Sequence, residues 1–161
     1  RASLSGRRGG AMSEKNPIRL YVTHAWEDGE DYLRVFEFLE SARNFFYRNC
    51  GRPDARPGGD VDAQREVLRA QIRPAEVVIA TASLLRGHSS LVVFQMTFAQ
   101  ASRKPVLLLP GFGQQVDIPK GVRDLATELV SWDERALVDA IRQHARGEQT
   151  GRWDTVEFKL D

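Results

Sequence analysis

Polar side chains that could bind a ligand follow several short apolar runs of the sequence. The segment THAWEDGE follows the run IRLYV and begins with a hydroxyl, an imidazole and an indole within four residues. The segment NCGRPDARPGGD supplies an amide and a guanidinium, and arginine is a suitable partner for a diphosphate. A serine ends the run VVIATAS. The candidate binding residues are Thr23, His24, Ala25, Trp26, Asn49, Arg52 and Ser83, and for each of them ordinary loop packing or solvation is the alternative.

Gln95 is an amide in the middle of FQMTFAQ, a segment with helical spacing. It falls on the stripe Leu91, Gln95, Phe98 and Ser102, whose members are four, three and four residues apart and therefore share one helical face. Because the rest of this segment is a packing surface, the amide is a candidate functional residue.

Several familiar chemistries lack the residues they require. A response-regulator receiver needs an acidic pair after its first strand and a phosphorylatable aspartate after its third, whereas this chain offers Thr23 with His24 and Ala82 with Ser83. Neither a Walker loop nor a GxGxxG turn occurs, and no G-x-S-x-G motif is present. The three histidines are too scattered to form a recognisable metal motif, so we expect no metal.

The composition is that of an ordinary globular chain. The 161 residues fit one domain with tails, and 42% hydrophobic and 28% charged residues predict one core of respectable size. A net charge of +1 gives no case for nucleic acid or an acidic membrane surface as a partner. No apolar run approaches the roughly 18 residues that a membrane helix needs. Cys50 is the single cysteine, which excludes an internal disulfide and favours the reducing cytoplasm.

The two ends of the chain differ from its centre. The start, RASLSGRRGGAMSEKN, has no apolar run that would make a signal peptide, and GGA before Met12 has the look of a cloning remnant. We therefore expect the natural start near Met12. Residues 1–16 are expected to be a disordered tag or arm, residues 17–147 the single domain, and residues 148–161 a C-terminal tail.

Short apolar runs alternate with helical patterns from Pro17 onward, which is typical of a parallel sheet covered on both faces. The expected strands are 18–23, 45–50, 76–83, 104–110 and 129–132. The expected helices are 30–42, 62–73, one capped by Ser89 or Ser90 and ending near 102, then 120–126 and 133–146. This alternation predicts a single α/β domain with a flavodoxin-like, doubly wound, five-stranded parallel sheet. In such sheets ligands bind outside the carboxyl ends of the strands, where the candidate residues lie.

Longer motifs follow one another in a fixed order along the chain. They are YVTHAWEDGEDYLRVFEFLE, FFYRN, VVIATASLL, HSSLVVFQMTFAQASRKPVLLLPGFGQ, IPKGV and LVSWDERALVDAIRQHA. This series is similar to that of the TIR-like family of bacterial antiphage proteins, whose best-known members signal in Thoeris defence, and it spans about residues 17–146. The resemblance implies a TIR fold and an activity that cleaves the nicotinamide glycosidic bond of NAD+. It thus implies that NAD+ is the substrate. It also implies frequent cyclisation of the ADP-ribose into a messenger for a partner effector.

The resemblance gives Gln95 a role. In the family the catalytic residue is a glutamate on the third helix, commonly preceded by a serine and a tryptophan and followed by Lys-Pro after nine and ten residues. Counting back from Lys104 and Pro105 leads to Gln95; Ser89 matches the serine and becomes a candidate binding residue, whereas Leu91 stands where the tryptophan is usual. The chain therefore carries an amide at the position of the family's catalytic carboxylate.

An amide in place of the carboxylate matters for the reaction. Breaking an N-glycosidic bond builds positive charge on the ribose carbon, and a fixed carboxylate stabilises that charge. An amide forms hydrogen bonds but carries no charge and takes no proton, and the expected loss in rate is on the order of 10²- to 10⁴-fold. Three explanations stay open: an engineered, inactivating substitution, a natural pseudoenzyme, and an ordinary glutamine. Two other functions stay open as well, a non-catalytic TIR-like module for self-association or nucleotide binding, and a nucleoside deoxyribosyltransferase-like enzyme.

Overall fold

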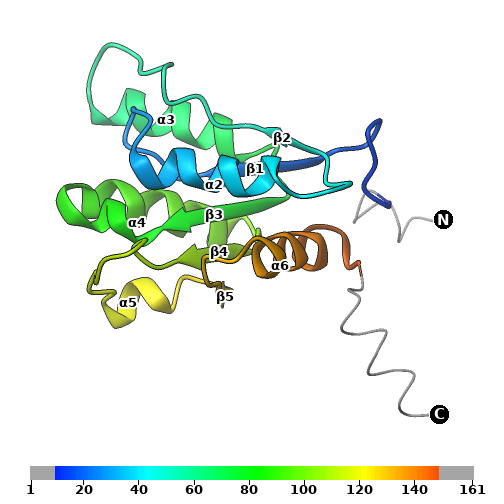
Figure 1. The fold of residues 1–161 in the computed structure, drawn as a ribbon. Coiled ribbons are helices and arrows are strands. Elements are labelled where there is room, and N and C mark those ends of the chain that lie inside the picture. The colour runs from blue at the N-terminus through cyan, green and yellow to red at the C-terminus, as the bar shows by residue number, and fades with distance from the viewer. Residues whose placement is uncertain (1–9, 149–161) are drawn as a thin grey trace, which may run out of the picture.

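The chain folds around one parallel sheet (Figure 1). The structure, a computed structural model, describes residues 10–148. The sheet has the order β2-β1-β3-β4-β5, and every pair of neighbouring strands is parallel. This order confirms the predicted flavodoxin-like, doubly wound α/β fold. The strands are β1 (Ile18–Val22), β2 (Tyr47–Asn49), β3 (Val77–Thr81), β4 (Val106–Leu109) and β5 (Glu128–Leu129).

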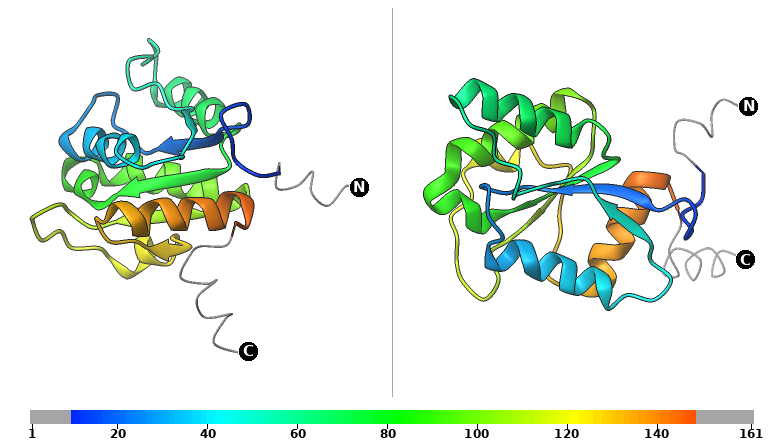
Figure 2. Two further views of the ribbon diagram at one scale, coloured as in Figure 1. Left: turned by 45° about the vertical axis from the view of Figure 1, so that its right-hand side comes forward. Right: turned by 90° about the horizontal axis from the view of Figure 1, so that it is seen from above.

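Helices cover both faces of the sheet. Seen from above in Figure 2, α2 and α6 lie on one side of the strands, and α3 and α4 lie on the other. The short α5 belongs to the same side as α3 and α4. The helices are α2 (Glu30–Glu40), α3 (Val61–Ile72), α4 (Leu85–Ala101), α5 (Lys120–Arg123) and α6 (Glu134–Arg146).

Side chains of the strands belong to two apolar clusters, one on each face of the sheet. Along β1, Leu20 packs toward α2 and α6, whereas Tyr21 packs toward α3 and α4. In β3, Ile79 packs toward α2 and α6, and Val78 packs toward α3 and α4. Because both faces are buried, β3 and β4 are built from almost continuous apolar runs.

Capping residues explain where two of the helices begin. Asp60 precedes α3, and its Oδ1 accepts a hydrogen bond from Ala63 N at 3.0 Å. Asp133 precedes α6, and its Oδ2 accepts a hydrogen bond from Ala136 N at 2.8 Å. Gly147 ends α6 in the left-handed conformation, with φ of 70°.

The start of α4 differs from the prediction. The helix begins at Leu85, with Leu84 at its N-cap in place of Ser89 or Ser90, and it is interrupted at residues 86–88. Gly87 has φ of 89° there, a left-handed conformation that breaks the regular hydrogen-bond pattern. Regular helical geometry resumes at Ser89, at the predicted start, although Ser89 then lies inside the helix rather than at its N-cap.

All five strands are shorter than predicted, and two of them differ most in how they end. The expected strand 76–83 ends at Thr81, where a 3-10 turn, η1 (Ala82–Leu84), takes over. The expected strand 129–132 is instead the two-residue β5, which starts one residue earlier. Trp132 does not continue the strand, because its indole N–H turns back to donate to Pro110 O at 2.7 Å.

The described parts of the expected arm and tail are attached to the domain. Residues 10–16 contain a tight turn closed between Ser13 and Asn16. Met12 N donates to Glu148 Oε2 at 2.9 Å, so the first and last described segments lie together. Residues 1–9 of the expected arm and residues 149–161 of the expected tail lie outside the described residues. None of the helices within residues 10–148 is long and apolar enough to cross a membrane.

Candidate functional site

Gln95 lies fully buried on α4, against the carboxyl end of β1. Its Oε1 accepts hydrogen bonds from the Tyr21 hydroxyl at 2.6 Å and from His24 N at 3.1 Å. Its Nε2 donates to His24 O at 2.9 Å and to Leu91 O at 3.0 Å. The amide thus uses two acceptor and two donor positions, which is all that its side chain offers. It fastens α4 to the loop that follows β1.

The surroundings of Gln95 distinguish an amide from a carboxylate. Two of its partners, His24 O and Leu91 O, are carbonyl oxygens that accept only, so the group facing them must donate. Burial raises the pKa of the Tyr21 phenol well above its usual value, and the nearby Tyr32 raises it further. The Tyr21 hydroxyl therefore stays protonated and donates to Oε1.

His24 extends this network to α3. The ring is fully buried; its Nδ1 accepts from Trp26 N at 3.1 Å, and its Nε2 pairs with Gln71 Oε1 at 3.0 Å. Because Nδ1 accepts, Nε2 carries the proton and donates to Gln71. Burial lowers the pKa of His24, although the Gln71 bond and the charge of Asp28 oppose the shift, so the imidazole is neutral near pH 7.

Trp26 holds an unusual backbone conformation beside His24. Its φ is 66°, in the left-handed region that an aromatic residue rarely adopts. The bond from Trp26 N to His24 Nδ1 supports this turn, and the two rings meet edge to face with centroids 5.0 Å apart. The loop after β1 is consequently shaped by the His24 ring.

Gln71 joins the network to the loop that follows β2. Its Oε1 also accepts from Arg52 N at 2.9 Å, and its Nε2 donates to Arg52 O at 3.2 Å. The Arg52 guanidinium is exposed and pairs with Asp54, with Nε 3.1 Å from Oδ1. This hydrogen bond raises the pKa of Arg52 and lowers that of Asp54. The structure thus fixes the backbone of Arg52 and leaves its charge at the surface.

Asn49 shapes the same loop from the end of β2. Its Oδ1 accepts from Gly51 N at 2.9 Å, and its Nδ2 donates to the Tyr32 hydroxyl at 3.1 Å. The Tyr32 ring in turn lies edge-on to His24, with centroids 6.4 Å apart. Asn49 therefore belongs to the shell around His24.

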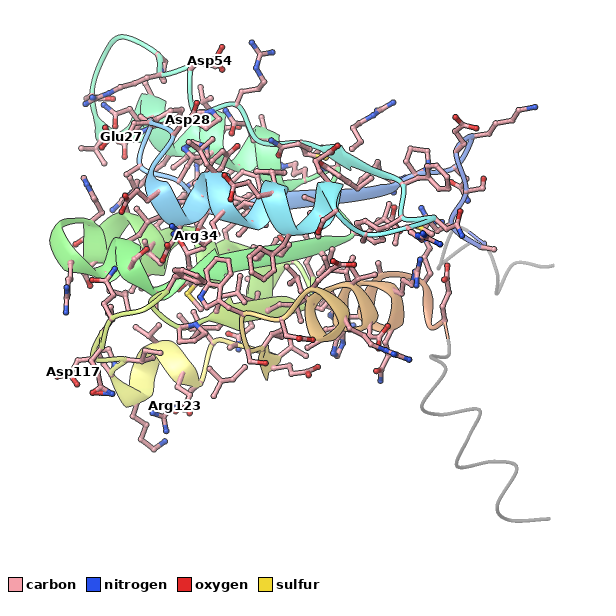
Figure 3. The ribbon with its side chains drawn as sticks, viewed as in Figure 1. Glu27, Asp28, Arg34, Asp54, Asp117 and Arg123 are labelled. Carbon is pink, nitrogen blue, oxygen red and sulfur yellow. The ribbon has the colours of Figure 1, made fainter. Side chains whose placement is uncertain are left out.

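Acidic side chains stand near this edge of the sheet. Figure 3 labels Glu27 and Asp28 in the loop after β1 and Asp54 in the loop after β2, near the same end of the molecule. Burial is the largest cause that raises the pKa of Tyr32, and the hydrogen bond from Asn49 opposes it. The negative charges of Asp28 and Asp54 raise this pKa further. An anionic ligand at this edge would therefore need Arg52 to offset these carboxylates.

The structure brings together most of the predicted residues but not all of them. Thr23 is fully buried, with Oγ1 accepting from Thr81 N at 3.4 Å, and Ala25 lies half-buried in the same loop as His24. Ser83, in η1, is half-buried and Ser89, on α4, is exposed; neither takes part in the bonds that join Gln95 to Gln71.

Sequence reasoning missed three members of the site, Tyr21, Tyr32 and Gln71. Gln71 could have been found from its spacing, because it lies three residues after Leu68 and directly before Ile72, both on the buried face of α3. This is the same kind of signal, an amide within an apolar stripe, that singled out Gln95.

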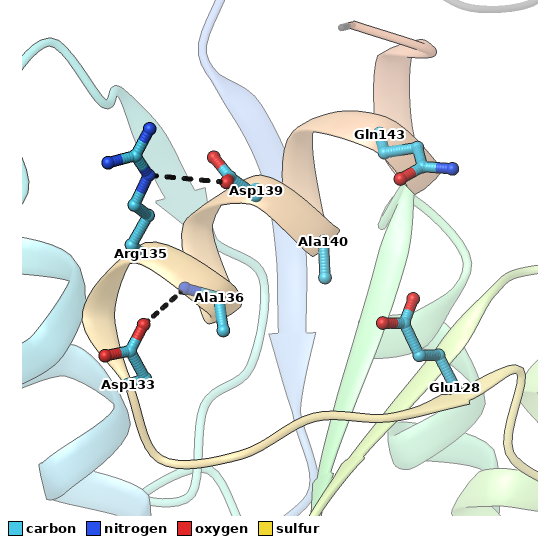
Figure 4. Close-up of a pocket in the computed structure, with 7 residues that line it drawn as sticks. All are labelled: Glu128, Asp133, Arg135, Ala136, Asp139, Ala140 and Gln143. Atoms are coloured by element: carbon cyan, nitrogen blue, oxygen red, sulfur yellow. Dashed lines mark hydrogen bonds and ion pairs between the residues drawn. The ribbon is translucent and has the colours of Figure 1, made fainter. Parts of the chain in front are cut away.

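A surface pocket of about 500 Å³ lies elsewhere, between α6 and β5 (Figure 4). Its rim carries the ion pair between Arg135 Nε and Asp139 Oδ2 at 3.9 Å. It shares no residue with the network around His24. The lining residues are Glu128, Asp133, Arg135, Ala136, Asp139, Ala140 and Gln143.

Among residues 10–148, no group of three histidine, cysteine, aspartate or glutamate side chains is arranged to hold a metal ion.

Neither a protein-family model nor a curated protein matches the chain. Among solved structures, the chain is similar to a conserved protein from Enterococcus faecalis V583, with a TM-score of 0.55 and 13% sequence identity. The similarity covers 79% of this chain and 98% of the other. A likeness at this identity shows a common fold, so the two proteins share the flavodoxin-like α/β architecture.

Proposed function

We propose that the chain is a TIR-like domain that binds NAD+ or a related ADP-ribose nucleotide at the carboxyl end of its sheet, and that it derives from enzymes that cleave the nicotinamide glycosidic bond. The observation that supports this is the direct bonding of Gln95 to His24. Two residues from the resemblance, far apart in sequence, meet at the edge where doubly wound sheets bind ligands.

In the proposed reaction the bond between the ribose carbon and the nicotinamide nitrogen breaks, and its electron pair stays with the departing nicotinamide. The sugar carbon then bonds to the oxygen of a water, which releases a proton to solvent, or to a nitrogen of the adenine for a cyclic product. Gln95 supplies no negative charge to the developing cation, so turnover by this chain is expected to be slow. The product would serve in the cytoplasm as a messenger to an effector in antiphage defence.

A second function is favoured by the four hydrogen bonds of Gln95. An amide whose donors and acceptors are all used by the protein is suited to holding α4 against the β1 loop rather than to reacting with a substrate. The alternative is a catalytically silent TIR-like module that binds a nucleotide or associates with other copies.

The experiment compares nucleotide binding and nicotinamide release. ADP-ribose and NAD+ are titrated calorimetrically into the native chain, into Arg52→Ala and into Arg123→Ala, which removes an exposed arginine on α5 as a matched control. We expect Arg52→Ala to weaken binding and Arg123→Ala to leave it unchanged. The absence of nucleotide binding by the native chain would refute the enzyme and the nucleotide-binding form of the module.

Nicotinamide release then separates the two functions. It is measured by chromatography for the native chain and for Gln95→Glu, with infection signals or partner proteins supplied. If the position is catalytic, the glutamate form is at least about a hundredfold faster. Equal, negligible rates with intact binding would support the silent module, and fast turnover by the native chain would show that Gln95 does not hold the catalytic position.

A further inference from the structure

The side chain of Gln71 lies on the packing face of its helix but is also hydrogen-bonded to two loops. It is 9% exposed and lies on the buried face of α3. One amide oxygen accepts from both His24 Nε2 and Arg52 N, at 3.0 and 2.9 Å, while the amide nitrogen donates to Arg52 O at 3.2 Å. Both backbone groups of Arg52 are therefore held by a single side chain.

We infer that Gln71 is a positioning residue, which fixes Arg52 so that its guanidinium meets the diphosphate of a bound ADP-ribose nucleotide. This inference rests on the proposed function. It assigns Gln71 no contact with the ligand. Its action passes through the backbone of Arg52 on one side and through the His24 ring on the other.

The chemistry of the two ends of Arg52 supports this assignment. Its backbone is bonded twice to a buried side chain, but its guanidinium is exposed and pairs with Asp54, which is also exposed. Such a surface ion pair contributes little to stability, so the guanidinium can leave Asp54 for a ligand phosphate at small cost. A phosphate offers the same two-oxygen geometry with more charge.

The bond to His24 couples this arginine to the loop after β1. His24 Nδ1 accepts from Trp26 N, and His24 N and O are bonded to Gln95. The loops after β1 and β2 thus share one chain of hydrogen bonds through Gln71. Buried networks of this kind hold their members in a single arrangement when every group is satisfied.

The test uses Gln71→Met, which keeps the length of the side chain and removes its hydrogen bonds. Gln64→Met, on the same helix, is the matched control, and ADP-ribose is the probe in calorimetry. We expect Gln71→Met to weaken binding about tenfold or more, the cost of a lost bond to a charged group. Arg52→Ala is made in the native and Gln71→Met backgrounds.

The decisive comparison is between the two backgrounds. If Gln71 acts through Arg52, then Arg52→Ala lowers affinity in the native chain and adds no further loss to Gln71→Met. An equal loss in both backgrounds, or no loss from Arg52→Ala alone, would overturn the inference while leaving nucleotide binding intact.

Hydrogen exchange supplies a readout that needs no ligand. Gln71→Met should make the Arg52 amide exchange about tenfold faster or more, whereas Gln64→Met should not. Gln71→Glu keeps the oxygen that accepts from Arg52 N and loses only the bond to Arg52 O, so it should retain most of the protection of the Arg52 amide. If Gln71→Met fails to fold, full loss of protection in a folded Gln71→Glu variant would refute the role. An unchanged exchange rate of the Arg52 amide in Gln71→Met would refute the positioning role. If this rate changes but the native chain binds no ADP-ribose, only the proposed function fails.

Discussion

Replacing Gln95 by glutamate should destabilise the fold. The two side chains have nearly the same volume, so the change tests hydrogen bonding and charge rather than packing. The amide nitrogen donates to His24 O at 2.9 Å and to Leu91 O at 3.0 Å. In the Gln95→Glu variant a carboxylate oxygen would face these two carbonyl oxygens at the same separations, without a hydrogen to share.

The size of the effect follows from these two lost bonds. A buried group left without its partner costs about 1–3 kcal/mol, so two such losses correspond to about 2–6 kcal/mol. Leu91 O also accepts the backbone bond of its helix, which reduces its share. We therefore expect about 2–4 kcal/mol at pH 7, against a total stability of about 5–15 kcal/mol for an ordinary domain.

The loss should depend on pH in a definite direction. A carboxyl group in this buried position has a pKa raised above the value of about 4.3 in the unfolded chain, because burial disfavours its charge. Below that pH the group is protonated in both states, and it can then donate one hydrogen bond. As the pH rises, only the unfolded chain ionises at first, so stability falls until the pH passes the folded pKa.

Urea denaturation at pH 4, 5, 6, 7 and 8 measures this slope for the native chain, for Gln95→Glu and for Gln95→Met. The methionine variant loses all four hydrogen bonds of Gln95 but cannot ionise, so its deficit should vary little with pH. A Gln95→Glu variant as stable as the native chain at pH 8 would refute the reasoning, because the site would then also satisfy the carboxylate oxygen that replaces Nε2.

Three further changes have measurable outcomes. Burial lowers the pKa of His24, so the native chain should lose stability as the pH falls below about 6.5, and His24→Gln should flatten that slope in thermal melts. Arg146 Nη2 lies 2.8 Å from Glu76 Oε2 in a largely buried pair, and Arg146→Met should cost about 3 kcal/mol in urea denaturation. A methyl group on Gly111 would lie 2.7 Å from the Val116 side chain, so Gly111→Ala should lower stability by about 1–3 kcal/mol, and an unchanged melting temperature would show that the loop yields.

The sheet could be predicted from the sequence because its strands are buried on both faces. Runs such as VVIAT in β3 and VLLL in β4 are apolar throughout, and each is followed by a helical pattern. The regular part of α4, from Ser89 onward, begins where the sequence predicted it. The preceding turn from Leu85 could not be predicted, because nothing local shows that Gly87 adopts a left-handed backbone. The bounds of β5 were equally hard to predict, since its two residues are both exposed.

The sequence by itself determined the order of elements, the loops at the carboxyl end of the sheet and the presence of an amide at position 95. Periodicity carries this information because it reports which face of each element is buried. Only the tertiary structure decided what the amides do. Gln95 lies 71 residues from His24, and Gln71 lies 47 residues from it, so no local pattern relates them. Their contacts exist because the strand order places β1 beside both β2 and β3, which brings the buried faces of α3 and α4 to the same end of β1.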